Sequence, residues 1–201
     1  MLSVSFTRRA AAAILASFLA CGGRVPPTLF YVLDLAAPEP AAAPRDRTAV
    51  LMPVRAGRVV GQGRIVYRES REQVGFYEYH RWAEDPEETV ARALRSALLA
   101  SGTFASVVPF DGRATADFLL RGELLRLEEV DYGGPVRAEA EISLELVDAA
   151  TGRVEWARAV SRTGEVAASA VPSVVSGMSV AAERAIRQLV KELDERLRSS
   201  E

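Results

Sequence analysis

The 201-residue sequence has little of the residues on which disulfides, metal centres and histidine catalysis depend. It contains one cysteine, Cys21, one histidine, His80, and a single lysine, Lys191. One thiol cannot form an internal disulfide. One histidine with one cysteine cannot supply the two-histidine or thiol-rich ligand sets that hold zinc. These shortages exclude a disulfide-framework protein and a cysteine- or histidine-based metal centre.

An excess of charge of one sign is also lacking, because 25 basic residues face 27 acidic ones and the isoelectric point is near 5.7. This balance gives no electrostatic footprint for a nucleic-acid partner, and 49% hydrophobic residues are too many for a disordered chain. No GxxxxGK[ST] loop occurs, and Gly61-Gln62-Gly63 precedes an expected strand rather than a helix. We therefore expect a globular domain without a nucleotide-binding loop.

The N-terminus has the pattern of an export signal. Residues 1–20 contain no acid and run from Arg8-Arg9 into eleven apolar or small residues, AAAAILASFLA. That run is shorter than the roughly 20 residues needed to span a membrane, so it predicts a signal peptide. The segment FLACG around Cys21 resembles a bacterial lipobox, whose cysteine receives the lipid. The pattern predicts a signal peptide over 1–20 and a lipidated tether over 21–28; the alternative is a secretory signal that leaves Cys21 as an unpaired thiol.

A lipid would have to anchor the chain alone. After loss of two arginines the mature chain has 23 basic and 27 acidic residues, or about −4, with no polybasic patch for lipid headgroups. Several acyl chains on Cys21 would hold firmly where one is marginal. Gly22 follows the cysteine, whereas the enterobacterial inner-membrane retention signal is an aspartate there. By that analogy we expect the periplasmic face of the outer membrane.

The remaining sequence predicts a single-domain α/β sandwich over residues 29–198. Val136 to Val147 alternates apolar and polar residues, as in an antiparallel strand with one buried face. Asp85, Pro86 and Glu88 form a capping signal for one helix that ends at Gly102. We expect a mixed, largely antiparallel sheet of about seven strands packed by two main helices. The expected strands are 29–35, 48–54, a 64–68 and 74–82 hairpin, 103–109, 116–130, 136–147 and 154–163, and the second helix begins after Pro172.

Residues for catalysis are hard to find in this pattern. His80 lies within an expected strand, with no serine or cysteine that the sequence links to it. Glu128 and Glu129 are neighbours at what we take for an exposed strand end, so their side chains point to opposite faces of the sheet and do not make a carboxylate pair. We predict a non-enzymatic protein without a cofactor or metal.

Aromatic residues crowd the expected hairpin. Cross-strand packing explains such crowding, and the functional alternative is a contact surface for a ligand or partner protein, where tyrosine and tryptophan are enriched. The candidate contact residues are Tyr67, Phe76, Tyr77, Tyr79 and Trp82.

The order of these features resembles the ABC-type transport auxiliary lipoprotein family over about residues 29–195. The resemblance rests on the lipobox, YVLDL, IVYR, HRWAEDPEETVARAL, LLASGTFASVV, ADFLLRGELLRLEEV, ELVDAATGRVEWAR and the closing helix. It implies an outer-membrane lipoprotein that assists an inner-membrane ABC or MCE-type system moving lipids or other hydrophobic molecules.

For the partner, we expect docking to the MCE protein rather than contact with lipid, since a helix-covered sheet leaves no obvious acyl-sized cavity in the pattern. Whether the chain forms a homo-oligomer stays open. The main alternative is a regulatory or assembly lipoprotein of cell-wall synthesis or secretion. An envelope hydrolase that uses His80 is a third class.

Overall fold

The computed structural model describes residues 25–40, 43–168 and 170–199. Its elements are β1 (Leu29–Tyr31), β2 (Thr48–Leu51), β3 (Arg55–Ala56), the 3-10 helix η2 (Val60–Gln62), β4 (Arg64–Arg68), β5 (Val74–Trp82), α2 (Pro86–Ala100), β6 (Ser106–Pro109), β7 (Phe118–Val130), β8 (Arg137–Asp148), β9 (Val154–Glu165) and α3 (Val171–Arg198).

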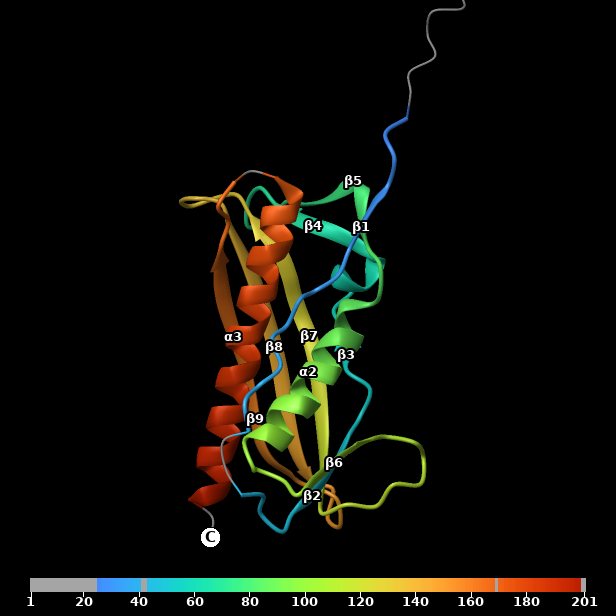
Figure 1. The fold of residues 1–201 in the computed structure, drawn as a ribbon, viewed down its shortest axis with the longest axis vertical. Coiled ribbons are helices and arrows are strands. Elements are labelled where there is room, and N and C mark those ends of the chain that lie inside the picture. The colour runs from blue at the N-terminus through green and yellow to red at the C-terminus, as the bar shows by residue number, and fades with distance from the viewer. Residues whose placement is uncertain (1–24, 41–42, 169, 200–201) are drawn as a thin grey trace, which may run out of the picture.

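The sheet is organised around β7, its longest strand (Figure 1). Along one edge β7 pairs antiparallel with β8 over its whole length, and β8 pairs antiparallel with β9. Along the other edge β7 pairs in turn with β2, β3 and β4, which are short and parallel to it. β6 continues the sheet beyond β2, whereas β5 and then β1 continue it beyond β4.

Two parts of the expected sheet were wrong. Within the described residues the sheet has nine strands rather than about seven, and five of its eight strand pairings are parallel. The one strand that lies outside every expected range is β3, which has two residues and lies in a segment expected to be a loop. The β7 to β9 meander is antiparallel as expected, but crossover connections bring the short strands back parallel to β7. The mixed α/β class with two main helices is confirmed.

Both helices cover the same face of the sheet (Figure 1). Pro86 begins α2, and Glu87 and Glu88 lie in its first turn, where the helix dipole favours acids. The predicted capping box does not form: the Asp85 side chain makes no capping hydrogen bond, and the Glu88 amide donates instead to the Asp85 carbonyl at 3.0 Å. Just beyond α2, Gly102 has a φ of 70°, which suits glycine at a helix end.

The core lies between these helices and the sheet. The apolar residues of β8 alternate as predicted, and Ile142 and Leu144 are fully buried beneath α3. α3 approaches β9 closely at two glycines: a Cβ on Gly177 would lie 2.8 Å from the Glu165 carbonyl oxygen, and one on Gly164 would overlap the Gly177 backbone. None of the helices in the described ranges has the length and hydropathy to cross a membrane.

Candidate functional site

Cys21, the predicted lipid attachment site, lies outside the described residues. The described chain begins four residues later at Val25 and enters the domain through β1 at the edge of the sheet (Figure 1). This entry is apolar and exposed: Val25 is 75% accessible and Phe30 63%, and Leu29 and Val32 are exposed as well. The N-terminal segment therefore presents large apolar side chains to its surroundings.

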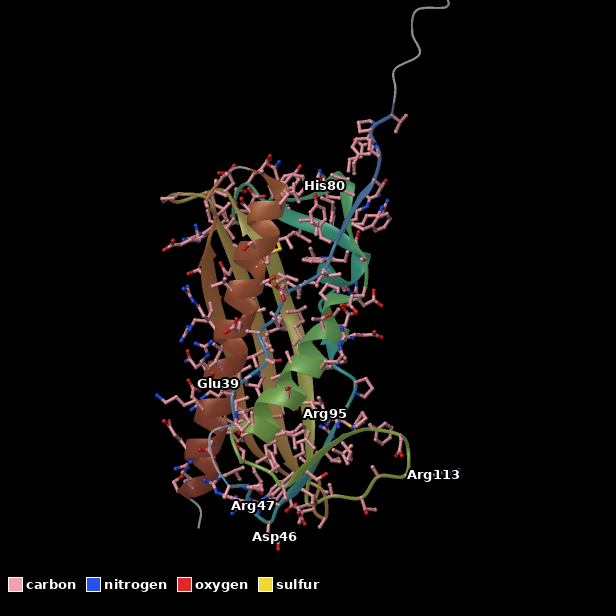
Figure 2. All side chains as sticks on the ribbon, in the orientation of Figure 1. Glu39, Asp46, Arg47, His80, Arg95 and Arg113 are labelled. Carbon is pink, nitrogen blue, oxygen red and sulfur yellow. The ribbon has the colours of Figure 1, made fainter. Side chains whose placement is uncertain are left out.

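Beside this entry, four ring side chains gather into what we call the aromatic cluster: Tyr31, Tyr67, Tyr77 and His80. The Tyr67 and Tyr77 rings meet edge to face with centroids 5.1 Å apart, and the Tyr77 and His80 rings do so at 5.6 Å. Tyr31 stacks on His80, and its hydroxyl lies 2.8 Å from His80 Nδ1. Figure 2 labels His80 at the end of the molecule where the N-terminal segment enters.

The other three predicted contact residues lie apart from this cluster. Phe76 is opposite Val66 in the β4–β5 register, so it points to the other face of the hairpin from Tyr77. Tyr79 hydrogen bonds with Glu78, which raises the pKa of the tyrosine hydroxyl. Trp82 is only 7% exposed and belongs to the core, so it is not available to a partner.

Glu129 completes the cluster from β7. It is 6% exposed, and its Oε2 accepts a 2.5 Å hydrogen bond from the Tyr77 hydroxyl. Burial and this hydrogen bond raise the pKa of Tyr77 far above its usual value. At neutral pH Tyr77 is therefore a hydrogen-bond donor and not a base, which suits recognition or structural support better than proton abstraction.

Glu128 points to the opposite face of the sheet, as the alternation predicted, but it is only 2% exposed. Its carboxylate accepts two hydrogen bonds from the Arg68 guanidinium, from Nε at 2.8 Å and from Nη2 at 2.9 Å. The expectation of an exposed strand end was wrong, because β4 pairs alongside this end of β7 and places Arg68 over it. Sequence periodicity predicted β4 but had no means of revealing that it pairs with β7.

The structure also contains a surface groove that the sequence did not reveal. A groove of about 680 Å³ lies between α2, α3 and the segment 35–39. We call it the helix groove. The only sequence signal for it is the small-residue spacing of Ala93, Ala97 and Ala100 on α2. Among the described residues, no group of three or more acids, histidines or cysteines is arranged to hold a metal ion.

The sequence matches the family model for ABC-type transport auxiliary lipoprotein components over residues 31–190. The chain belongs to this family. The match runs from the last residue of β1 into α3 as far as Val190. It includes the aromatic cluster but leaves out Lys191, Asp194 and Arg198 of the helix groove. Among curated proteins, none matches this sequence.

Solved structures share the fold of this auxiliary lipoprotein. A protein from Xanthomonas campestris aligns with a TM-score of 0.76 at 18% identity, over 86% of this chain and 98% of that one. The PelC dodecamer from Paraburkholderia phytofirmans aligns with a TM-score of 0.50 at 18% identity, over 78% of this chain and 94% of that one. A hypothetical protein from Chlamydia trachomatis aligns with a TM-score of 0.51 at 11% identity, over 76% of this chain and 98% of that one. At these identities the likeness concerns the fold alone.

Proposed function

We propose that this auxiliary lipoprotein is anchored to the periplasmic face of the outer membrane through a lipid on Cys21, and assists an ABC transport system without enzymatic activity of its own. Its partner in this proposal is the MCE protein of the system, and the cargo is a lipid or another hydrophobic molecule. The observation that carries the proposal is the family match over residues 31–190, which begins ten residues after the lipobox cysteine.

The entry of the chain supports the anchor. Val25 lies four residues after Cys21, a span of at most about 14 Å. The exposed Leu29 and Phe30 follow directly. Apolar side chains so near a lipidated residue would lie within reach of the bilayer surface, where their burial adds to the hold of the lipid. The domain would then stay close to its membrane.

A docking surface for the MCE protein is proposed on the hairpin beside this entry. Tyr67, Phe76, Tyr77 and Tyr79 are each half-buried, so rings on both faces of the hairpin still present accessible area to a partner. Tyrosine contributes large contact area at low entropic cost, which is why it recurs in protein interfaces. Trp82 is left out of this surface because it lies in the core.

The proposal is tested by crosslinking in intact cells followed by recovery of the tagged full-length chain from membranes. We expect an MCE-domain protein among the crosslinked partners, with the chain in the outer-membrane fraction. Recovery of cell-wall synthesis enzymes alone would overturn the MCE partner. Cys21→Ala is the matched control: it should lose lipid labelling and leave the outer-membrane fraction, and a variant that remains there would contradict the anchor.

The second candidate is an assembly lipoprotein of secretion, and one observation favours it: a structure with this fold is a dodecamer. The two candidates differ in their gene neighbours. Genes for an MCE protein, a permease and an ATPase beside this one would support transport, whereas a penicillin-binding protein or a secretion cluster would support regulation or assembly. Size measurement of the purified lipoprotein would show separately whether it forms a homo-oligomer.

A further inference from the structure

The helix groove has a predominantly apolar wall built from small and branched side chains. Ala93, Ala97 and Ala100 recur at spacings of four and three and therefore share one face of α2. Ile186 and Val190 recur at the same helical spacing on α3 and form the facing wall. A volume of about 680 Å³ lies within the range of roughly 300 to 1,000 Å³ usual for ligand sites.

The third side of the groove is a strap, residues 35–39, which runs between α2 and α3 (Figure 1). Its start is fixed to α3, because the Asp34 amide donates to Ser179 Oγ at 3.1 Å and Leu33 is buried in the core. Farther along, Ala36 and Ala37 are exposed and add only methyl groups to the lining. Figure 2 shows Glu39 beside the lower half of α3. The strap leaves a long opening rather than a closed cavity.

Charged side chains of both signs line the α3 rim of this opening, since the acids Glu183 and Asp194 belong to the lining as well as the cations. Arg187, Lys191 and Arg198 are all well exposed, and each pairs with an acid one helical turn away on the same helix. Exposed pairs of this kind contribute little to stability. The cations can therefore exchange these partners for an anionic group on a ligand at little cost.

An apolar wall beneath a rim of exposed, exchangeable ion pairs fits a molecule with an aliphatic chain and an anionic head. We propose that the helix groove binds one acyl chain of an anionic amphiphile, with its head at Arg187, Lys191 and Arg198. This inference rests on the proposed function for the class of cargo and goes beyond it, because it makes the domain a direct lipid contact. A membrane phospholipid and a free fatty acid share this chemistry.

The test uses the full-length lipoprotein in vesicles of phosphatidylethanolamine and phosphatidylglycerol. Each vesicle sample contains a trace of one probe with a photoreactive diazirine at the end of its acyl chain: phosphatidylglycerol, phosphatidylcholine or palmitic acid. After illumination, labelled peptides are mapped by mass spectrometry. We expect labels on α2 and α3 at the groove, with the phosphatidylglycerol or palmitic acid probe identifying the source. Labels confined to residues 25–32 would overturn the proposal.

Variants show whether the groove itself is responsible. Ala97→Phe fills the α2 wall and Ala37→Phe fills the groove from the exposed strap, where folding is least at risk. Each should lower labelling roughly tenfold, since a filled groove excludes several methylenes of the chain. Ala159→Phe, on the exposed opposite face of the sheet, is the matched control and should label like the unchanged chain. Unchanged labelling in both groove variants would overturn the proposal.

The head group is tested by the phosphatidylcholine probe. We expect about fivefold weaker labelling than with phosphatidylglycerol, because the zwitterionic head has no net negative charge to draw Arg187, Lys191 and Arg198 from their acidic partners. Equal labelling would overturn the anionic preference. Groove and transport role fail separately: an MCE partner recovered without groove labelling overturns only the groove, whereas labelling without an MCE partner overturns only the transport role.

Discussion

The two faces of the β7–β8–β9 sheet are built from the same strands but are stabilised in different ways. On the face under α3, Ala138, Ala140, Ile142 and Leu144 of β8 are fully buried and pack by shape. On the other face, which neither helix covers, arginines and glutamates form ion pairs across the strands. Packing in a dry interior is intolerant of added volume, whereas exposed ion pairs contribute little each. The same strand should therefore tolerate change very differently on its two sides.

The largest effect is expected where α3 approaches β9. Gly164→Ala places a methyl group against the backbone of Gly177, which no side-chain rotation can relieve. We expect a loss of about 3 kcal/mol in the free energy of unfolding, measured by urea denaturation. Gly61→Ala is the control, since its Cβ would meet only the Ala56 Cβ at an ordinary 3.4 Å. Equal losses in the two variants would contradict the close approach of α3.

An intermediate effect is expected at the buried ion pair of Arg68 and Glu128. This pair lies on the face of the sheet that neither helix covers, which we call the polar face. Glu128→Ala leaves the largely buried Arg68 without its carboxylate partner, which should cost about 2 to 3 kcal/mol. Glu145→Ala is matched to it, because Glu145 faces Arg121 at 4.0 Å on the same face but is exposed, and should cost less than about 1 kcal/mol. In 1 M salt the Glu145 effect should vanish and the Glu128 effect persist. Similar losses at both positions would show that the polar face is uniformly weak.

The smallest effect is expected at Glu129, the one glutamate that the packed face buries. Tyr77→Phe removes the hydroxyl that donates to it and should cost about 1 to 2 kcal/mol at pH 7. Tyr79→Phe, whose partner Glu78 is exposed, is the control and should leave the free energy of unfolding nearly unchanged.

Alkaline pH sharpens this prediction. Burial raises the pKa of Tyr77 above the unfolded value of 10.0, so its contribution is complete below pH 10 and is lost as pH rises beyond that. The unchanged chain should therefore lose more stability between pH 9 and pH 11 than Tyr77→Phe does. Parallel losses in the two proteins would contradict this role of Tyr77.

Local sequence patterns predicted the elements whose partners lie nearby. β4 and β5 have the predicted bounds, and α3 presents the predicted apolar stripe to the sheet. Other strands are shorter than predicted: β2 ends at Leu51, two residues before Pro53, which has no amide hydrogen to donate to a neighbour. A strand ends where its partner ends, and the partner comes from distant sequence.

For the same reason, the sequence patterns could not predict burial that depends on distant segments. The sequence could not show that Glu128 and Glu129 are buried, because the side chains that cover them, Arg68 and Tyr77, come from the hairpin about 50 to 60 residues earlier. Nor could it show the helix groove, since alanines on a helix usually indicate close packing. Here they lie beneath a strap that leaves them partly uncovered.

The parallel pairing of β1 with β5 has a mechanical consequence. β1 has three residues and lies at the edge of the sheet, and the segment toward the predicted anchor leads directly into it. Tension applied at the N-terminus would therefore load this short pairing before any part of the core. Release of β1 alone would lengthen the tether by about 10 Å. Further extension would be resisted at Leu33, which is buried in the core. The domain would therefore gain a little reach toward its membrane while the core and the helix groove stayed intact.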